Sequence, residues 1–504
     1  MRIEGYYLSV AENGLADAVR DAAALFALSA AGRLADREVG DCLPAGAVFI
    51  RNTVNSGSQV VEVVTEVFFR QEADSLGCRS RRATGGGDEP AAAAVQRLVR
   101  LNLLAILGEL TGRQTGPWGI LRGVRPTKIL HRLLDRGLAP EAVRTRLASH
   151  YAVDTAKAEL ITEIALRQRP FLPPAGPSGR LVAVYIGVPY CPSRCLYCSF
   201  PANVLPADPD RLAAFTGALA TDIAAAARLM ERHGLAAESV YVGGGTPTSL
   251  GEAAFADLLT SVRRAFVSSE TREFTVEAGR PDSLTDGKIA AMAAAGVGRV
   301  SVNPQTMQEK TLKLIGRNHS VYDIIEMFRK IRAKPIPVIN MDIIAGLPGE
   351  DEAAMADTLA RIGELAPDNL TVHTLAIKRG SLLAERPEAA LPDEATTANM
   401  LALAAAVARN MGMSPYYLYR QKYMTGNLEN VGYALPGCEC LYNIQIIEER
   451  QTVIGIGPAA GTKAVENNFR LTSCYNPKDV PTYIKNLATY TARRDSLIAG
   501  LFKA

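Results

Sequence analysis

Three cysteines lie close together in the stretch YCPSRCLYCSF, at positions 191, 195 and 198. A structural zinc site needs four nitrogen or sulfur ligands, commonly as two separated pairs, and no fourth ligand stands nearby. Cysteine thiolates also hold iron–sulfur clusters. The spacing therefore favours a [4Fe–4S] cluster bound by Cys191, Cys195 and Cys198, with one iron left open, over a zinc site or metal-free thiols.

Other polar and glycine-rich segments follow short apolar runs, at 243–248, 277–280 and 303–305, and Asp342 and His373 stand in similar places. A run of glycines lets a backbone approach a ligand closely, although it is also typical of a plain tight turn. Asp342 interrupts the apolar run NMDIIAG, where a buried carboxylate needs a partner. His373 and His319 are either catalytic or simply hydrogen-bonded to backbone.

The elements that must position these groups alternate between short apolar runs and amphipathic segments of helical length. The six runs are LVAVYIGV, SVYVGGG, EFTVEAG, GRVSVNP, VINMDIIAG and NLTVHTLAI. This alternation predicts an α/β fold with a parallel sheet coiled into a partial (β/α)6 barrel. Active sites in such barrels gather at the C-terminal ends of the strands, where the polar segments stand.

The chain of 504 residues is too long for one ordinary core. Proline and glycine in FLPPAGPSGR predict a linker at 171–180. Residues 1–170, with a hairpin around 43–70 that turns near Gly57 and a long helix ending near Gly108, predict an N-terminal α+β accessory domain. Residues 181–394 would form the barrel with its iron–sulfur cluster, and 395–504 a C-terminal α+β extension, as a domain or lid.

Composition is that of an ordinary globular protein, with 48% hydrophobic and 21% charged residues and a net charge of +3. That charge gives no reason to expect nucleic acid as a partner. No apolar run reaches the roughly 18 residues of a membrane span, and MRIEGYYLSV does not look like a signal peptide. We therefore expect a cytoplasmic protein without membrane insertion, in a reducing compartment where Cys438, Cys440 and Cys474 stay free thiols.

The pattern CxxxCxxC after the first barrel strand resembles that of the radical S-adenosylmethionine (SAM) superfamily. The segments YVGGGTPTSL, TVEAGRPDSL, SVNPQTMQEKTLKLIGRNHS and INMDIIAGLPGE resemble the oxygen-independent coproporphyrinogen III oxidase/dehydrogenase family within it. GPWGILRGVRPTKILHRL, PYYLYRQKYMTGNLENVGYALPG and QTVIGIGPAAGTK are similar to its HemZ-type branch, which carries an extra N-terminal domain. The resemblance covers nearly the whole chain.

This resemblance implies that SAM chelates the open iron and that an electron from the cluster cleaves SAM to a 5′-deoxyadenosyl radical. It implies either one or two SAM molecules, held by Tyr185, Tyr197, Gly243, Gly244, Gly245, Thr246, Glu277, Gln305, Arg317 and Asp342. Arg317 and Gln305 could instead be ordinary solvated side chains. No catalytic acid or base is implied, since Phe200 and Gly187 replace a cysteine and a histidine of the better-known HemN-type branch.

The implied reaction is the oxidative decarboxylation of coproporphyrinogen III propionates to vinyl groups, which gives protoporphyrinogen IX in haem biosynthesis. A haem chaperone, or methyl transfer or ring opening on another tetrapyrrole, would share the same motifs. Six cations could pair with substrate carboxylates or be solvated: Arg280, Lys378, Arg379, Arg420, Lys422 and Lys463. The basic segment 122–136 could dock an acidic electron donor, a flavodoxin or ferredoxin, or be a solvated helix face.

Overall fold

The computed structural model describes residues 1–10, 14–57, 60–71, 75–86, 89–113, 116–123, 125–173, 179–200, 203–378, 380–386, 390–421, 424–466 and 469–502. Contacts divide the chain into two units. The N-terminal unit comprises Met1–Thr162 with Arg420–Lys422, and the barrel unit comprises Glu163–Tyr419 with Tyr423–Ala504. Both Arg379 and Lys422 lie outside the described residues, as do residues 174–178 of the predicted linker.

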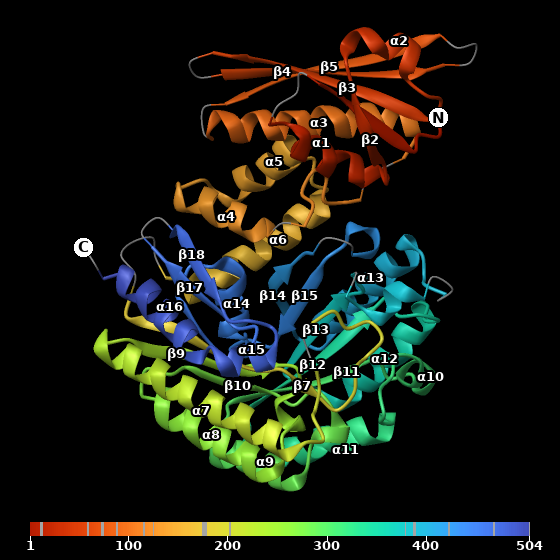
Figure 1. Cartoon of the computed structure of the whole chain (residues 1–504). Helices are drawn as coiled ribbons and strands as arrows, with labels where there is room; N and C mark the ends of the chain where they lie inside the picture. Colours follow the sequence, from red (N-terminus) through yellow and green to blue (C-terminus); the bar gives the residue numbers. More distant parts are fainter. Residues whose placement is uncertain are drawn as a thin grey trace. The chain divides into compact units, whose positions relative to one another are not determined.

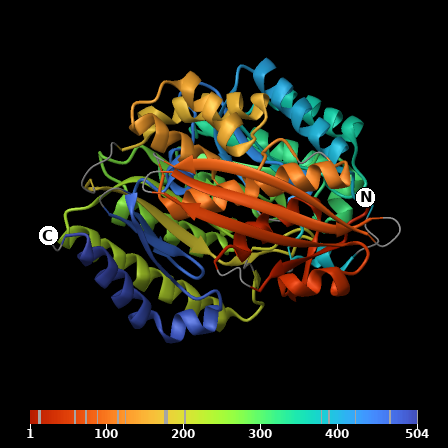
Figure 2. The same ribbon diagram turned by 90° about the horizontal axis from the view of Figure 1, so that it is seen from above.

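The N-terminal unit is built on a five-stranded sheet with strand order β2-β1-β3-β4-β5. Its strands are β1 (Gly5–Ser9), β2 (Ser29–Leu34), β3 (Ala47–Ser56), β4 (Val60–Arg70) and β5 (Leu76–Gly86). Strand β1 runs parallel to β2 and β3, whereas β3, β4 and β5 are antiparallel. The predicted hairpin is therefore present as β3 and β4, and Figure 2 shows these long strands side by side.

Alternation along β4 explains how this sheet builds a core, because every second side chain faces the helices. The helices of the unit are α1 (Ala16–Ala23), α2 (Val39–Cys42), α3 (Ala91–Thr111), α4 (Pro126–Asp135), α5 (Pro140–Tyr151) and the start of α6 (Thr155–Gln168). Val63 and Val67 of β4 share one buried cluster with Leu103 and Leu107 of α3 and with Val19 of α1. The predicted long helix is α3.

The barrel unit contains an eleven-stranded sheet with order β14-β15-β13-β12-β11-β10-β9-β6-β16-β17-β18. Six of its strands run parallel to their neighbours in the order in which they pair: β6 (Leu181–Val188), β9 (Ala236–Gly244), β10 (Glu273–Glu277), β11 (Arg299–Gln305), β12 (Val338–Ala345) and β13 (Asn369–Thr374). All six apolar runs thus form strands, and the predicted partial (β/α)6 barrel is confirmed.

Helices between these strands cover the outside of the barrel, as Figure 1 shows for α7, α8 and α9. They are α7 (Pro209–Arg232), α8 (Glu252–Phe266), α9 (Asp286–Ala294), α10 (Glu309–Leu314), α11 (Val321–Arg332) and α12 (Glu352–Leu365). Each amphipathic helix turns its apolar side inward: Phe255, Leu259 and Val262 of α8, for example, are buried. The C-terminal ends of the strands are therefore surrounded by the loops that connect each strand to the next helix.

Residues after 394 add strands to both sides of the barrel sheet. Strands β14 (Ser414–Tyr419) and β15 (Asn430–Ala434) extend it beyond β13, and β16 (Val453–Ile456), β17 (Gly461–Val465) and β18 (Leu471–Tyr475) extend it beyond β6. The helices here are α13 (Glu394–Asn410), α14 (Leu441–Glu448), α15 (Val480–Lys485) and α16 (Leu487–Gly500). The C-terminal α+β extension therefore shares the sheet of the barrel, while a domain boundary at 394/395 stays a prediction.

Two helices of the described chain, α3 and α7, have the length and apolar composition of a membrane span, with mean hydropathies of 1.4 and 1.3. Core helices of globular proteins have the same properties. Leu103 and Leu107 of α3 are buried in the N-terminal unit, and Phe215 and Leu229 of α7 are buried in the barrel unit. Both helices thus use apolar residues for packing.

Candidate cluster and cofactor site

The three cysteines follow the C-terminal end of β6: Cys191 ends the short strand β7 (Tyr190–Cys191), and Cys195 and Cys198 lie in the loop after it. Cys195 is buried, and Cys191 and Cys198 are partly buried. Burial raises the pKa of the Cys191 and Cys198 thiols, because it disfavours the charged thiolate. Thiolates in this loop need a compensating positive charge, which the iron ions of a cluster would supply.

No group of three or more His, Cys, Asp or Glu side chains, in the part of the chain that the structure describes, is arranged to hold a single metal ion. A structural zinc ion would need such a converging set. In a cubane cluster, each cysteine thiolate binds a different iron, so the three sulfurs need not meet at one point. The loop therefore fits a [4Fe–4S] cluster better than zinc.

Backbone and side-chain hydrogen bonds tie this loop to distant parts of the barrel unit. The N–H of Leu196 donates to Ile315 O at 2.9 Å, and the N–H of Leu383 donates to Leu196 O at 2.9 Å. Ser193 Oγ donates to Gly316 O at 3.2 Å. The loop that carries the cysteines is thus fixed by the segment after α10 and by the segment after β13.

Arg317 lies directly against the loop and is buried, so the alternative of a solvated residue is wrong. Its Nη1 donates to Asn303 O at 2.6 Å and to Gly279 O at 3.2 Å, and its Nη2 donates to the hydroxyl of Tyr197 at 3.0 Å. These bonds fix the guanidinium between the ends of β10 and β11 and the aromatic residue of the cysteine motif. The structure thus brings together Arg317 and Tyr197, two of the predicted SAM residues.

Several buried polar atoms near this arginine have no hydrogen-bond partner among the described residues: Arg317 Nε, Gln305 Oε1 and Asn303 Oδ1. Gln305 ends β11 with a φ of 69°, in the left-handed region that non-glycine residues seldom adopt. Each unsatisfied buried polar atom costs about 1–3 kcal/mol. A ligand that carries both an acceptor and a donor could pair with this donor and these two acceptors.

The three glycines at the C-terminal end of β9, Gly243 to Gly245, are required by the protein's own packing. A Cβ at Gly245 would lie 2.5 Å from Tyr190 O, and one at Gly243 would lie 2.8 Å from the carboxyl carbon of Glu277. Gly244 has a φ of +112°, which strains any other residue. The adjacent Thr246 donates from Oγ1 to Cys191 Sγ at 3.4 Å. The loop 243–246 thus lies against both Glu277 and the cysteine loop, while its contact with SAM stays a prediction.

Glu277 ends β10 in a buried environment rich in tyrosine. Tyr241 donates its hydroxyl to Glu277 Oε1 at 2.7 Å, and the N–H of Gly244 is a second donor. Burial raises the pKa of Glu277 to about 7, and the charge of Asp342 adds to this rise. The two hydrogen bonds act in the opposite direction and lower the pKa. Near neutral pH, this carboxyl group therefore exists in both protonation states.

Tyr185 and two tyrosines that sequence reasoning missed, Tyr241 and Tyr442, form a stack beside Glu277. The ring centroids of Tyr241 and Tyr442 are 4.5 Å apart, and those of Tyr185 and Tyr442 are 5.9 Å apart. Tyr241 alternates with buried Val240 and Val242 on β9, a pattern that could have identified it. Tyr442 comes from α14 and carries no local signal of this role.

Asp342 and His373 lie near each other on the neighbouring strands β12 and β13. Asn340 donates to Asp342 Oδ1 at 2.7 Å, while His373 Nε2 is 3.5 Å from Asp342 Oδ2. The hydroxyl of Tyr419, at the end of β14, is 2.9 Å from His373 Nδ1. A chain of polar groups thus leads from the carboxylate to the end of β14. The other histidine, His319, is buried with its Nδ1 3.8 Å from Asp282.

The cations predicted for substrate carboxylates do not gather in one place. Lys463 pairs with Glu449 at 2.6 Å. Arg420 belongs to the N-terminal unit, where it lies over the ring of Trp118 at 4.6 Å from the centroid. Lys378 is only partly buried, and the charges of Lys378 and Cys198 interact. Of the described cations in this set, Lys378 is therefore the one placed to meet a substrate beside the cysteine loop.

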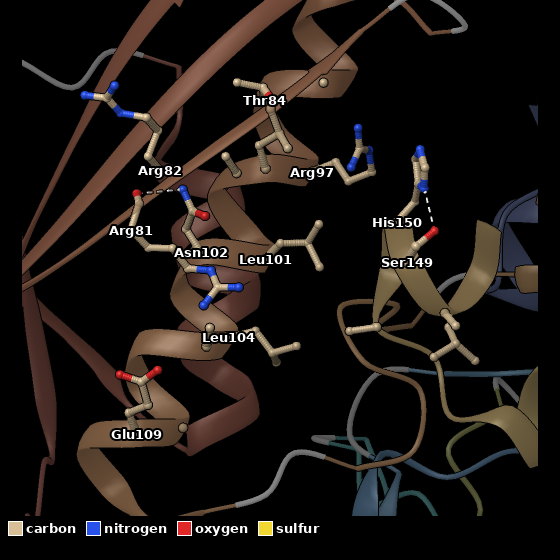
Figure 3. A pocket seen from close by; sticks show the side chains of 18 of the residues that line it. Arg81, Arg82, Thr84, Arg97, Leu101, Asn102, Leu104, Glu109, Ser149 and His150 are labelled. Atoms are coloured by element: carbon tan, nitrogen blue, oxygen red, sulfur yellow. Dashed lines mark hydrogen bonds between the residues drawn. The ribbon is translucent and has the colours of Figure 1, made fainter. Parts of the chain in front are cut away.

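The N-terminal unit holds a cleft of about 920 Å³ between β5, α3 and the end of α5. Figure 3 shows Arg97 and Leu101 projecting from α3 toward the side formed by Ser149 and His150. Arg97 is itself paired with Glu89 at 2.6 Å. The described residues of the segment 122–136, which contains α4, are not part of the lining, and the role of this segment in docking an electron donor stays a prediction.

Comparison with known proteins bears on both units. Residues 185–362 match the model of the Radical SAM superfamily. The chain is 38% identical over 408 residues to the oxygen-independent coproporphyrinogen-III oxidase-like protein HemZ of Bacillus subtilis, covering 80% of this chain and 81% of that protein. It is also 30% identical over 337 residues to the heme chaperone HemW of Mycobacterium tuberculosis, covering 65% of this chain and 80% of that one.

Among solved structures, the chain is similar to the coproporphyrinogen III oxidase HemN of Escherichia coli, with a TM-score of 0.51. The two are 21% identical, and the match covers 65% of this chain and 73% of HemN. At this identity the likeness concerns the fold, and it agrees with the partial barrel described above.

Proposed function

We propose a function from one premise, that the chain belongs to the radical SAM superfamily and, within it, to the family of oxygen-independent coproporphyrinogen-III oxidase-like proteins. The proposed activity is the oxidative decarboxylation of coproporphyrinogen III propionates to vinyl groups, giving protoporphyrinogen IX. A [4Fe–4S] cluster and SAM are the cofactors of the superfamily and of this chain. When bound, they would supply the reductive cleavage of SAM and the resulting 5′-deoxyadenosyl radical, which takes a hydrogen atom from the substrate.

The observation that carries the proposal is the set of unpartnered polar atoms beside the cysteine loop. SAM has a carboxylate and an ammonium group at its methionyl end. Arg317 Nε is a buried donor for the carboxylate, and Gln305 Oε1 and Asn303 Oδ1 are buried acceptors for the ammonium. An enzyme that cleaves SAM needs this pairing of groups, and a haem chaperone that shares the same motifs could keep it.

The other predicted residues take roles consistent with their surroundings. Cys191, Cys195 and Cys198 would hold three irons. Glu277 would accept hydrogen bonds from the ribose hydroxyls, and its two oxygens suit a vicinal diol. Tyr185, Tyr197 and Asp342 would line the remaining SAM surface, together with the backbone of Gly243, Gly244, Gly245 and Thr246. The stacked tyrosines would exclude water from this space.

Lys378 would hold a substrate propionate near the cluster loop. The substrate loses a hydrogen atom from the propionate β-carbon, and then CO₂ and one electron, which leaves the vinyl group. An external one-electron acceptor takes that electron. We infer that a flavodoxin or ferredoxin reduces the cluster and that the enzyme works in the cytoplasm, without nucleic acid or membrane insertion.

Haem transfer is the second candidate, because the HemW relative matches over 80% of its own length. Methyl transfer or ring opening on a tetrapyrrole would use the same SAM site. These functions differ in the fate of the propionate hydrogen, which gives a direct way to separate them.

The test is an anaerobic incubation of the full chain with SAM, a strong reductant, an electron acceptor and coproporphyrinogen III deuterated at the propionate β-carbons. We expect CO₂, a vinyl product and deuterium in 5′-deoxyadenosine by mass spectrometry. Lys378→Ala should reduce vinyl formation more than SAM cleavage. Tight haem binding and transfer without deuterium in 5′-deoxyadenosine would instead support a chaperone, and S-adenosylhomocysteine with a methylated tetrapyrrole would support methyl transfer.

A further inference from the structure

Arg280 follows the end of β10, and its side chain is turned into the cysteine loop. Its Nη1 donates to Ser193 O at 3.0 Å, and its Nη2 donates to Ser193 Oγ at 2.9 Å. Nη1 also lies 3.7 Å from Cys195 Sγ, within hydrogen-bonding range of sulfur. Because the side chain is only 4% exposed, the prediction that Arg280 binds a substrate carboxylate is wrong: its donors are used within the protein.

A carboxylate balances this buried cation. Asp282 accepts from Arg280 Nε at 3.0 Å and from Nη2 at 2.8 Å, a bidentate pair. Burial raises the pKa of Asp282, but the hydrogen bonds from Arg280 and the nearby His319 outweigh this and lower it to about 2. The pair is therefore ionised at neutral pH, with the guanidinium toward the cysteine loop and the carboxylate on its other side.

Two independent features set this arginine apart from a residue that only supports the fold. It contacts the one cysteine of the three that is buried, Cys195. It also fixes both the backbone and the hydroxyl of Ser193, two residues before that cysteine. Arg317, whose charge also interacts with Cys195, contacts the same loop through Tyr197. Two buried guanidinium groups therefore act on a single thiolate.

We propose that Arg280 is a positioning residue for the cluster, which donates a hydrogen bond to the Cys195 thiolate and raises the cluster's reduction potential. Reduction adds an electron to the cluster, and a nearby positive charge in a buried environment stabilises the reduced form. Hydrogen bonds to the sulfurs and net charge are established determinants of these potentials. Asp282 would moderate the effect, because its negative charge lies beside the same guanidinium.

The test is a redox titration of the reconstituted protein without SAM or substrate. Electron paramagnetic resonance at each potential measures how much of the cluster is reduced. Arg280→Gln should shift the midpoint potential to more negative values. Asp282→Asn should shift it to more positive values, since it leaves the guanidinium charge unbalanced. Arg280→Lys should shift it less than Arg280→Gln, because the charge remains. The control is Arg272→Gln, which removes an exposed arginine just before β10 and should leave the potential unchanged.

An unchanged potential in Arg280→Gln at full iron content would overturn the proposal. So would shifts of the same sign in Arg280→Gln and Asp282→Asn, which would indicate a general loosening of the loop. If Arg280→Gln fails to assemble a cluster, Arg280→Lys and Asp282→Asn decide, and an unchanged potential in both overturns the proposal. The measurement needs only the cluster, so its outcome is separate from that of the decarboxylation test.

Discussion

Strand β10 begins and ends with a glutamate, and the two side chains have different surroundings. Glu273, at the N-terminal end of the barrel, accepts from the N–H groups of Leu441 and Tyr442 at 2.7 and 3.1 Å and from Cys440 Sγ at 3.3 Å. Arg299 Nε lies 3.5 Å away. Glu277, four residues on at the C-terminal end, has two donors, and no cation is among the groups that shift its pKa.

The same contrast extends to the neighbours of each glutamate. At the N-terminal end, Arg299 bonds Asn369 and the carbonyls of Cys438 and Glu439, while its Nε has no hydrogen-bond partner among the described residues. At the C-terminal end, Arg317 and Gln305 keep buried atoms without partners among the described residues. Burial of charge alone therefore does not mark a functional site in this barrel. The two ends differ in charge balance: Arg299 lies beside Glu273, whereas no cation is among the groups that shift the pKa of Glu277.

The largest expected effect separates the cysteines at the two ends. Cys191→Ala should abolish cluster assembly, because it removes one of three protein ligands. Cys440→Ala, at the opposite end beside Glu273, should keep full iron and sulfide content after anaerobic reconstitution. Chemical iron analysis checks both variants. Equal loss of iron in the two would remove the distinction between the ends.

Glu273→Ala should lower the free energy of unfolding by about 3–5 kcal/mol, because it leaves Arg299 buried without its carboxylate. The first turn of α14 also loses its acceptor. Urea denaturation of the protein without cofactors measures this. SAM affinity in the remaining folded protein should not change. A cost below about 1 kcal/mol would mean that the N-terminal network is not what holds this end together.

Glu277→Gln should alter the pH dependence of stability. Between pH 4.5 and about 7 the folded protein keeps a proton on Glu277 that the unfolded chain has released, so stability falls as pH rises through this window. The fall corresponds to about 3 kcal/mol. The variant, which cannot ionise, should be more stable than the wild type at pH 8 and equal to it at pH 4. Denaturation curves without cofactors at both values check this, and parallel pH profiles would contradict it.

Asp342→Asn should have the smallest effect, a roughly tenfold loss of SAM affinity, or about 1.4 kcal/mol. The amide keeps the shape of the side chain but loses the charge that faces His373. Equilibrium dialysis of reconstituted protein measures the affinity, and iron content serves as the control. Loss of the cluster in this variant would show that Asp342 belongs to the support of the cysteine loop instead.

Sequence patterns predicted the six parallel strands because each is buried on both faces and reads as a continuous apolar run. They also predicted that polar side chains gather at one edge, since parallel strands bring their C-terminal ends together, while their roles toward SAM stay a prediction. Strand β5 was missed: its sequence LGCRSRRATGG lies at the edge of its sheet, is mostly exposed and lacks apolar alternation. Its partner β4 alternates clearly and was found.

Contacts between distant segments could not be predicted. Arg280 stands 85 residues from Cys195, and nothing in RPDSL shows that its side chain turns toward the cysteine loop. Tyr442 reaches the tyrosine stack from α14, beyond the last parallel strand of the six. Likewise, local patterns gave a C-terminal extension but not the sheet edges that it joins. The periodicity of apolar residues indicates which face of an element is buried, but not which distant segment packs against that face.

Strand β6, which leads into the cysteine loop, pairs on one side with β9 and on the other with β16. During synthesis, the second edge of β6 stays open from the time Val188 is made until Val453 follows. At about 5–20 residues per second, this takes roughly 10–50 s on the ribosome. The strand before the cysteines is thus fully paired only late in synthesis, after β16 has been made.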